Sequence, residues 1–262
     1  MNHMTKKSTE RFTETLKNYS QYRPSYPKEI LSVMQVECSL TQDKMIADVG
    51  SGTGILTKLF LDHGNVVYAV EPNTAMREVA EHNLKSYPHF HSIVGTAEST
   101  TLQNQSVDFV TVGTAFHWFD LIKTKQEFKR ILKTPGWVVL LWNVRNKESQ
   151  LIGDYENLIL KYNTDYCESN ASKFDKTVTE AFFTPFIMKT KIFKNIQYFN
   201  WESFQGRFLS SSYIIRSDDS RYEKMIEELK NIFDRYQKNG QIEFSNDTKI
   251  YYGQLSSMRK VW

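Results

Sequence analysis

Residues 45–54 read Met-Ile-Ala-Asp-Val-Gly-Ser-Gly-Thr-Gly, a short apolar strand followed by glycine at every second position. Because glycine has no Cβ, a turn through Gly50, Gly52 and Gly54 can adopt positive φ and let a ligand lie against the backbone. Apolar residues at helical spacing predict a helix over residues 54–63, whose first N–H groups would point at that ligand. This stretch therefore predicts a strand, a glycine turn and a helix that bind a nucleotide-like molecule.

A second strand is predicted over residues 66–70, where the run Val-Val-Tyr-Ala-Val ends at Glu71. A carboxylate about 20 residues beyond a glycine turn, at the end of the next strand, is placed to accept hydrogen bonds from ribose hydroxyls. Glu71 could alternatively cap the helix that begins near Thr74. We interpret Glu71 as a ribose-binding residue.

The glycines follow the spacing Gly-x-Gly-x-Gly, whereas the dinucleotide fingerprint is Gly-x-Gly-x-x-Gly, and Ile55 stands where its third glycine would be. With Asp48 two residues before Gly50, the segment resembles the first motif of class I S-adenosylmethionine-dependent methyltransferases. These enzymes often carry an acid-Pro-x-x-x-Met run, which here extends from Glu71 to Met76. The resemblance implies that Met76 packs on the adenine, and ordinary core packing is the alternative.

The same resemblance concerns the turn Gly95-Thr96-Ala97-Glu98, which follows a strand predicted over residues 90–94. It implies that this turn lies beside the adenine, with Glu98 near the exocyclic amine. The alternative for Glu98 is a solvated loop acid. A fourth strand is predicted over residues 107–112, and the loop after it contains the aromatic sequence Phe116-His117-Trp118-Phe119.

Strand and helix signals alternate through residues 45–142, and a fifth strand over 136–142 follows an amphipathic helix and a tight turn at Pro135-Gly136. We predict an α/β fold, a doubly wound Rossmann-like sheet of seven strands, mostly parallel with the last strand antiparallel. Strands over 191–200 and 247–253 complete it, and helices over 150–183 and 201–238 form a cap. We predict one methyltransferase domain over 1–262, with an N-terminal lid at 10–30, a cofactor-binding core at 45–142, and the cap with its additional strand at 150–240.

The lid contains the run Tyr-Arg-Pro-x-Tyr-Pro, in which two prolines fix the backbone and keep the preceding residues extended. We expect Tyr19, Tyr22 and Arg23 to contact the methionine carboxylate of the cofactor or the substrate, although a lone arginine is more often a surface residue. Together with residues 116–119, this run resembles small-molecule methyltransferases similar to trans-aconitate methyltransferase. Residues 210–214 and the closing strand fit the end of that group.

His117 is the best-placed titratable residue for a catalytic base, because the ordinary pKa of histidine lies near 6.5. Its alternative role is a wall of the pocket. The predicted substrate-binding residues are Tyr22, His117, Trp118 and Tyr213. The predicted cofactor-binding residues are Tyr19, Arg23, Asp48, Gly50, Ser51, Gly52, Gly54, Glu71, Pro72, Met76, Thr96, Ala97, Glu98, Thr114 and Phe116. No metal is predicted.

The 262 residues are 40% hydrophobic and 24% charged, with a net charge of +3 and no basic run, so composition does not indicate nucleic-acid binding. Two cysteines cannot form a disulfide framework, and no apolar run reaches about 18 residues, so we expect a cytoplasmic protein without membrane association. The predicted function is methyl transfer from S-adenosylmethionine to a small molecule at oxygen, a carboxylate or hydroxyl. The alternatives are an RNA or protein methyltransferase, a non-catalytic Rossmann-like binding protein, and an NAD-dependent dehydrogenase.

Overall fold

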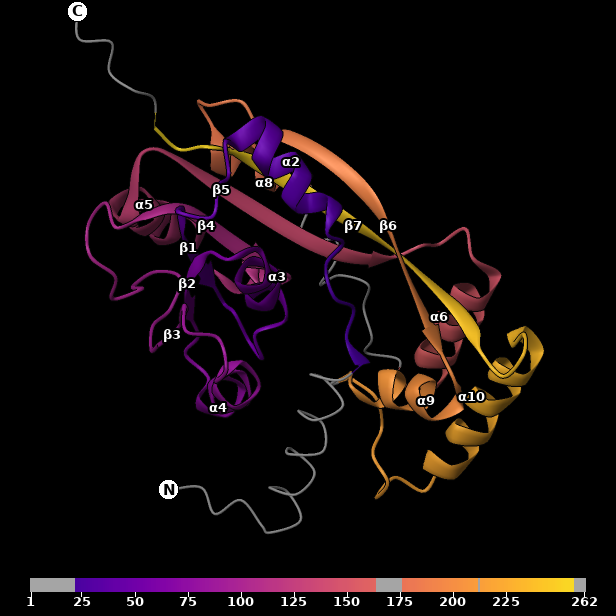
Figure 1. Cartoon of the computed structure of the whole chain (residues 1–262). Helices are drawn as coiled ribbons and strands as arrows, with labels where there is room; N and C mark the ends of the chain where they lie inside the picture. The colour runs from indigo at the N-terminus through magenta and orange to yellow at the C-terminus, as the bar shows by residue number, and fades with distance from the viewer. Residues whose placement is uncertain (1–21, 164–175, 212, 257–262) are drawn as a thin grey trace, which may run out of the picture. The chain divides into compact units, whose positions relative to one another are not determined.

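The computed structural model describes residues 22–163, 176–211 and 213–256 (Figure 1). Contacts divide the chain into two compact units: unit 1 consists of residues 1–24, 145–168 and 194–247, and unit 2 of residues 25–144, 169–193 and 248–262. The elements are α2 (Glu29–Cys38), β1 (Met45–Val49), α3 (Ile55–His63), β2 (Val66–Val70), α4 (Thr74–Leu84), β3 (Phe90–Ile93), β4 (Val107–Gly113), the short 3₁₀-helix η1 (Phe116–Trp118), α5 (Leu121–Ile131), β5 (Leu132–Arg145), α6 (Gln150–Tyr162), α8 (Lys176–Phe183), β6 (Lys189–Phe199), α9 (Trp201–Leu209), α10 (Tyr222–Tyr236) and β7 (Ile242–Gln254).

The strands form one seven-stranded sheet in the order β3-β2-β1-β4-β5-β7-β6. β1 pairs in parallel with β2 and β4, β2 with β3, and β4 with β5. One strand of the sheet is antiparallel, which confirms the predicted doubly wound fold. The chain winds outward from β1 to β3 and then returns to β4 beside β1. This change of direction creates a switch point at the carboxyl ends of β1 and β4, where doubly wound sheets bind their ligands.

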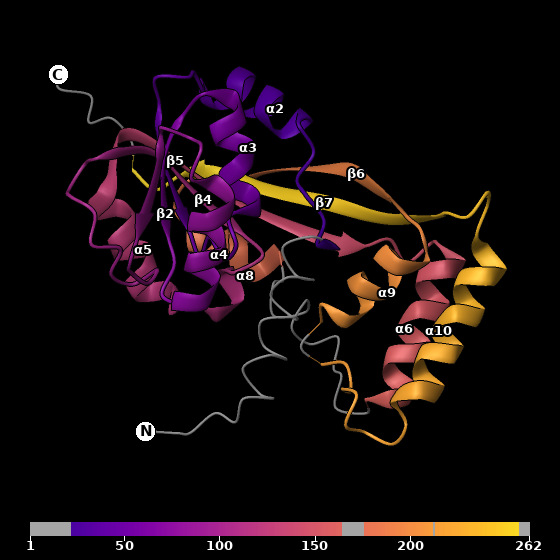
Figure 2. The same cartoon turned by 60° about the horizontal axis from the view of Figure 1, so that its bottom comes forward.

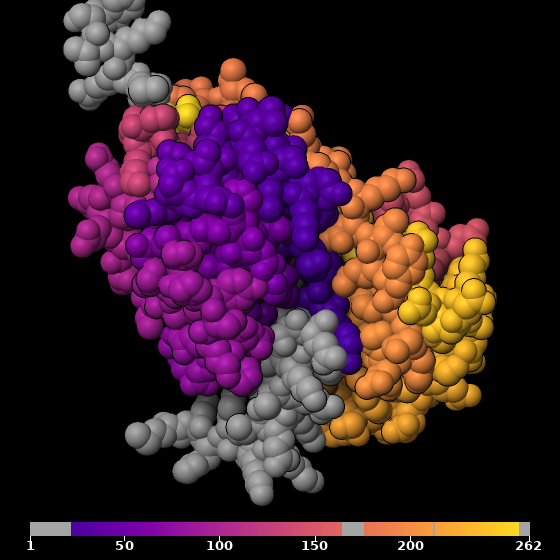
Figure 3. Space-filling model, in the orientation of Figure 1, coloured from indigo at the N-terminus to yellow at the C-terminus, as the bar shows by residue number. Residues whose placement is uncertain are grey.

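Alternation along the strands of unit 2 gives the sheet two apolar faces, because successive side chains point to opposite sides. Ile46 and Phe109 pack with Ile30 of α2 and Phe60 of α3 in one buried cluster. The neighbouring strand residues pack with α5 and α8 in another cluster, which includes Ala47, Val110, Phe128 and Phe182. Figure 2 shows α2 and α3 on one side of the sheet and α5 on the other. In Figure 3, the indigo and violet residues around α2 and α3 form a continuous surface.

Unit 1 has its own core, in which α6, α9 and α10 pack around aromatic residues. Tyr155 of α6 is fully buried, and its ring centroid lies 5.3 Å from that of Phe208 and 5.2 Å from that of Phe244. Phe204 contacts Tyr155 from the same helix as Phe208, at 5.7 Å between ring centroids. The aromatic residues after position 150 therefore contribute substantially to a hydrophobic core.

Several predicted boundaries need correction. The predicted helix over 150–183 appears as α6 and α8, and residues 164–175 between them lie outside the described part of the chain. The predicted tight turn at Pro135-Gly136 is wrong, because both residues lie inside β5, beside a register shift against β4. The helices predicted over 201–238 appear as α9 and α10; α10 ends at Tyr236, and Gly240 lies in the turn that precedes β7. Within the described residues, every helix is too short or too polar to cross a bilayer.

Candidate active site

The glycine turn after β1 is built around three residues that adopt positive φ: 69° at Gly50, 55° at Gly52 and 84° at Gly54. A Cβ on Gly50 would lie 2.7 Å from the Cβ of Ala115, and one on Gly54 would lie 2.7 Å from Cδ1 of Leu84. These two glycines therefore allow close packing within the protein. Among the described residues, a Cβ on Gly52 would meet only the sulfur of Met76, at 3.9 Å. Within this part of the chain, the backbone at Gly52 is therefore not covered by side chains, and a ligand can approach it.

Glu71 directly follows β2 and links this strand to the glycine turn. Its Oε2 accepts a hydrogen bond from the Gly52 N–H at 2.8 Å, and its Oε1 accepts one from the Asn73 N–H at 2.8 Å. Asn73 itself caps α4, since its side chain accepts from the Met76 N–H, so the alternative role of Glu71 as that cap is wrong. A carboxylate offers about four acceptor positions, and two of them remain for ribose hydroxyls.

Met76 lies on α4, and the predicted adenine turn lies in the loop after β3. Met76 is half-buried on α4 and lies outside the buried core, next to Gly52. Thr96 and Ser99 pair across a tight turn that carries Ala97 and Glu98 at its tip. Ala97 is buried, Pro72 and Thr96 are exposed, and Ser51 is buried in the glycine turn. The adenine contacts of these residues remain predictions.

Hydrogen bonds hold Glu98 in its loop. Its Oε1 accepts from the Asp120 N–H at 2.9 Å. Burial opposes ionisation of this carboxyl, but the bonds from the Asp120 backbone and the Thr96 side chain outweigh it and hold the pKa below its usual value. Glu98 is therefore an ionised acceptor at neutral pH. This carboxylate joins two loops through an exposed hydrogen bond, and both its predicted position near the adenine and its alternative role as a solvated loop acid stay open.

Asp48 lies on β1 and is fully buried. Its Oδ2 accepts a hydrogen bond from Thr57 of α3 at 2.6 Å, and its Oδ1 accepts from Thr111 of β4 at 3.3 Å. Burial raises the pKa of this carboxyl to about 7, despite the two hydroxyl donors. The contacts show Asp48 joining β1, α3 and β4 beneath the glycine turn, while its predicted role toward the cofactor remains a prediction.

The loop after β4 contains His117 and Trp118, two of the residues predicted to bind the substrate. The ring centroid of His117 lies 4.6 Å from that of Trp118 and 4.9 Å from that of Trp142. Trp118 is 73% exposed, whereas Phe116 is buried against Phe182, so the two aromatic residues that flank His117 have different environments.

The contact of Ala115 with the glycine turn places this loop directly beside Gly50. Thr114 adopts positive φ, and its hydroxyl hydrogen-bonds to the hydroxyl of Tyr26 at 3.2 Å. Sequence reasoning missed Tyr26, although it is the second tyrosine of the Tyr-Arg-Pro-x-Tyr-Pro run. A Cβ on Gly113 would lie 2.6 Å from its hydroxyl oxygen, so the ring of Tyr26 covers the end of β4.

The other predicted substrate and lid residues belong to unit 1. Tyr22 packs against Gly206 of α9, where an added Cβ would lie 2.2 Å from its ring. Arg23 donates to the backbone oxygen of Ser210 at 3.3 Å, and the hydroxyl of Tyr213 accepts from Arg145 at 2.5 Å. Tyr19 and most of the predicted lid lie outside the described residues. Contact of these residues with cofactor or substrate stays a prediction.

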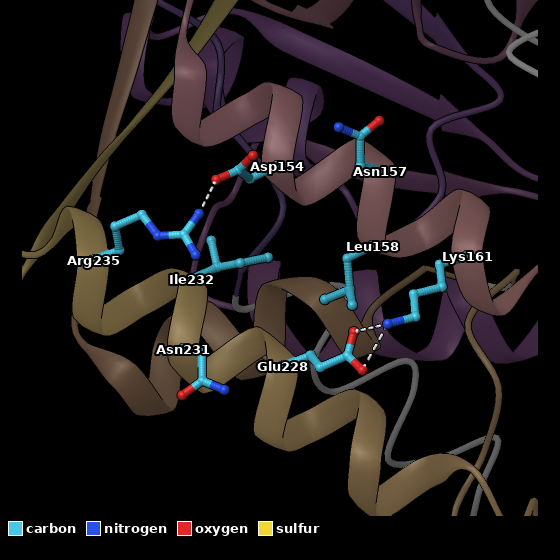
Figure 4. A pocket seen from close by; sticks show the side chains of 8 residues that line it. All are labelled: Asp154, Asn157, Leu158, Lys161, Glu228, Asn231, Ile232 and Arg235. Carbon is cyan, nitrogen blue, oxygen red and sulfur yellow. Dashed lines mark hydrogen bonds and ion pairs between the residues drawn. The ribbon is translucent and has the colours of Figure 1, made fainter.

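A pocket of about 320 Å³ lies between α6 and α10 in unit 1 (Figure 4). Its charged residues pair with one another: Arg235 with Asp154 at 2.7 Å, and Lys161 with Glu228 at 2.7 Å. Because these charges are already neutralised, the pocket offers little to a charged ligand, and sequence reasoning placed no site there. The described residues contain no group of three or more His, Cys, Asp or Glu residues arranged to hold a metal ion.

Comparison with known proteins agrees with this geometry. A family described as "Methyltransferase domain" matches residues 47–140, the segment from β1 to β5. An uncharacterised methyltransferase of Schizosaccharomyces pombe is 28% identical over 248 residues, covering 92% of this chain and 95% of that protein. An uncharacterised methyltransferase of Mycobacterium bovis is 35% identical over 129 residues, 49% of this chain and 50% of that protein.

Among solved structures, one from Anaeromyxobacter dehalogenans, described as a type II methyltransferase, aligns with a TM-score of 0.62 at 18% identity. The alignment covers 90% of this chain and 99% of that one. At this level of sequence identity, the structural likeness establishes the fold alone. The methyltransferase activity is supported by the match to the methyltransferase domain and by the curated relatives. The methyltransferase-domain match and the curated relatives, on this fold, support an S-adenosylmethionine-dependent methyltransferase of class I.

The residues present fit this cofactor. The open space at Gly52 leaves room for a ligand against the backbone, and Glu71 keeps acceptor positions for the ribose hydroxyls. Glu71 is held in a fixed orientation by two backbone N–H groups, so little conformational freedom is lost when it binds. We expect Gly52 and Glu71 to hold the ribose and Met76 to contact the adenine.

Proposed function

We propose that the protein transfers the methyl group of S-adenosylmethionine to an oxygen atom, a carboxylate or a hydroxyl, of a small organic acceptor. The observation that supports this proposal is the contact of the His117 ring with two tryptophan rings, in the loop that packs against the glycine turn. Flat aromatic surfaces with one titratable group suit a small organic molecule, because they give apolar contact and fix one polar group.

Each part of this loop has a chemical role in the proposal. The bound cofactor supplies an electrophilic methyl group, so the protein must orient the acceptor oxygen and exclude water. Trp118 and Trp142 provide the apolar walls that do both. The imidazole of His117 accepts the proton of a hydroxyl acceptor, whereas a carboxylate acceptor is already ionised and needs no base.

A labelled methyl group tests the proposal. The purified protein is incubated with S-adenosylmethionine carrying a radioactive methyl group and with separate pools of small carboxylic acids, small hydroxyl compounds, total RNA and mixed proteins. We expect label in a small-molecule pool, released by mild alkali as methanol from an ester and stable as an ether. Label only in RNA, only in protein, or only on nitrogen would contradict the proposal.

Substitution of His117 separates the two kinds of oxygen acceptor. With a hydroxyl acceptor, His117→Gln should lower kcat by roughly 10²–10⁴-fold, as expected for loss of a general base. With a carboxylate acceptor, the same change should lower kcat by less than about tenfold, since only positioning is lost. The matched control is His82→Gln, because His82 is exposed on α4.

A further inference from the structure

Two large apolar side chains are exposed to water close to His117 in the sequence of unit 2. Trp118 of η1 is 73% exposed, and Ile122 in the first turn of α5 is 76% exposed. Between them, the Asp120 side chain accepts hydrogen bonds from the N–H groups of Ile122 and Lys123 and so caps the helix. Tryptophan is on average a strongly buried residue, because its ring can remove about 150–250 Å² from water. The exposure of Trp118 therefore needs a physical reason.

Ring contacts connect Trp118 to the interior of the same unit. Trp142 of β5 is only 6% exposed, and its ring centroid lies 4.9 Å from that of His117. The ring centroid of His117 in turn lies 4.6 Å from that of Trp118. A buried indole is thus joined through the imidazole to an exposed indole. A ligand that contacts only Trp142 and His117 leaves the apolar surface of Trp118 and Ile122 in water.

The segment that carries the two exposed side chains is held on both sides. The Asp120 N–H donates to Oε1 of Glu98 at 2.9 Å, which joins this segment to the loop after β3. Phe116, two residues before Trp118, is buried, and its ring centroid lies 4.9 Å from that of Phe182 in α8. Side chains on an anchored backbone lose little conformational freedom when they bind a ligand. The exposed pair is therefore a preorganised apolar surface.

This apolar surface is small, because it ends within the first turn of α5. The exposed residues that follow Ile122 on the helix are Lys123, Gln126 and Lys129, all of them polar. A tryptophan ring removes about 150–250 Å² from water, whereas each partner in a stable protein interface buries about 800 Å². Two side chains are too small a surface for a protein partner and suit a narrow apolar ligand.

We propose that Trp118 and Ile122 bind a hydrocarbon chain of the methyl acceptor, so that the acceptor is a carboxylic acid or an alcohol with an alkyl chain. This inference rests on the proposed function, since it names the class of acceptor for the same site. The polar end of the acceptor lies at His117, and its chain covers Trp118 and Ile122. Each methylene group that leaves water against these side chains strengthens binding.

Chain length is the variable that tests this inference. Octanoate and 1-octanol serve as long probes, and butyrate and 1-butanol serve as short probes of the same head groups. All four are used as monomers on the full chain with excess S-adenosylhomocysteine. Calorimetry should show at least tenfold tighter binding of the long member in one of the two series. Equal affinity of long and short members in both series, or no binding of any probe, would overturn the proposal.

Substitutions then locate the chain on the protein. Trp118→Ser should weaken binding of the long probe at least tenfold, and Ile122→Ser should weaken it several-fold. The matched control is Val36→Ser, because Val36 is 83% exposed on α2 of the same unit, and this change should leave the affinity unchanged. Each variant should keep the Tm of the wild type, since the side chains removed are exposed. Unchanged affinity in Trp118→Ser, or equal losses in Ile122→Ser and Val36→Ser, would overturn the proposal.

Tryptophan fluorescence gives a second measurement that does not depend on turnover. The long probe should shift the emission of the wild-type protein to shorter wavelength, because it removes the exposed indole of Trp118 from water. The same probe should leave the emission of Trp118→Ser unchanged. An equal shift in both proteins would place the chain at another tryptophan and overturn the proposal.

The assays also separate this inference from the proposed function. Transfer of label to a small acid or alcohol, with equal affinity for long and short probes, overturns the chain site and supports the proposed function. Binding of a long probe that depends on Trp118, in a protein that transfers label only to RNA or protein, supports the chain site and contradicts the proposed function. Attachment to phosphatidylcholine vesicles without binding of the monomeric probes would show insertion into a bilayer and overturn the proposal.

Discussion

Replacement of Gly52 by alanine tests whether the glycine turn is a ligand cradle. Among the described residues, the added Cβ would meet no atom closer than the Met76 sulfur at 3.9 Å, so no steric clash with them is expected. The positive φ of 55° at Gly52 imposes a strain of about 1–2 kcal/mol on any residue with a Cβ. We therefore expect a folded variant that is destabilised by roughly that strain. The methyl group would occupy the space through which a ligand approaches the backbone.

Gly240→Ala is the matched control, because Gly240 has a φ of 78° and a Cβ there would meet no atom of the described residues within 4 Å. Both variants should lose a similar free energy of unfolding, measured by urea denaturation. Calorimetry with S-adenosylhomocysteine should show at least tenfold weaker binding for Gly52→Ala, about 1.4 kcal/mol, and unchanged binding for Gly240→Ala. Wild-type affinity in a folded Gly52→Ala protein would refute the cradle.

Three further variants test the neighbouring residues. Glu71→Gln should weaken S-adenosylhomocysteine binding at least tenfold in calorimetry, about 1.4 kcal/mol, while Glu78→Gln, at an exposed site on the next helix, should not. Burial raises the pKa of Asp48 from 3.8 to about 7, so the folded protein retains a proton that the unfolded chain releases, and wild-type stability falls as pH rises through this interval. Asp48→Asn should reduce this pH-dependent loss in the free energy of unfolding, measured by urea denaturation, by at most about 4 kcal/mol. An unchanged dependence of stability on pH would contradict the raised pKa of Asp48. Tyr26→Phe removes the hydrogen bond to Thr114 and should lower stability by about 0.5–1.5 kcal/mol; a larger loss would mean that the hydroxyl has other essential contacts.

The sheet could be predicted because local patterns determine it. The glycine turn, the acid at the end of the second strand and the alternation of apolar residues all act over short stretches of sequence. The structure confirms β1 to β4 at nearly the expected bounds. Pro135 and Gly136 indicated a turn by local propensity, but both lie inside β5, at the register shift between the Val107–Leu132 and Phe109–Trp137 pairs with β4. The tertiary environment overrides local preference there.

The candidate site shows the same division between local and long-range information. The position of Glu71 directly after β2 could be predicted from its distance to the glycines. The contact of Tyr26 with Thr114 joins residues 88 positions apart, so no local pattern indicates it. Arg207 is one of the two charged residues of α9, the other being Glu202. Its burial beside Tyr155 depends on how α6 and α9 pack, which the sequence pattern does not specify.

A crystal structure with S-adenosylhomocysteine tests the central claim most directly. The account predicts the ligand at the carboxyl ends of β1 and β2, with its ribose hydroxyls hydrogen-bonded to the carboxylate of Glu71 and its adenine against Met76. The backbone at Gly52 should contact the ligand with no intervening side chain. A ligand bound elsewhere, or a ribose that makes no contact with Glu71, would contradict the assignment of this turn as the cofactor site.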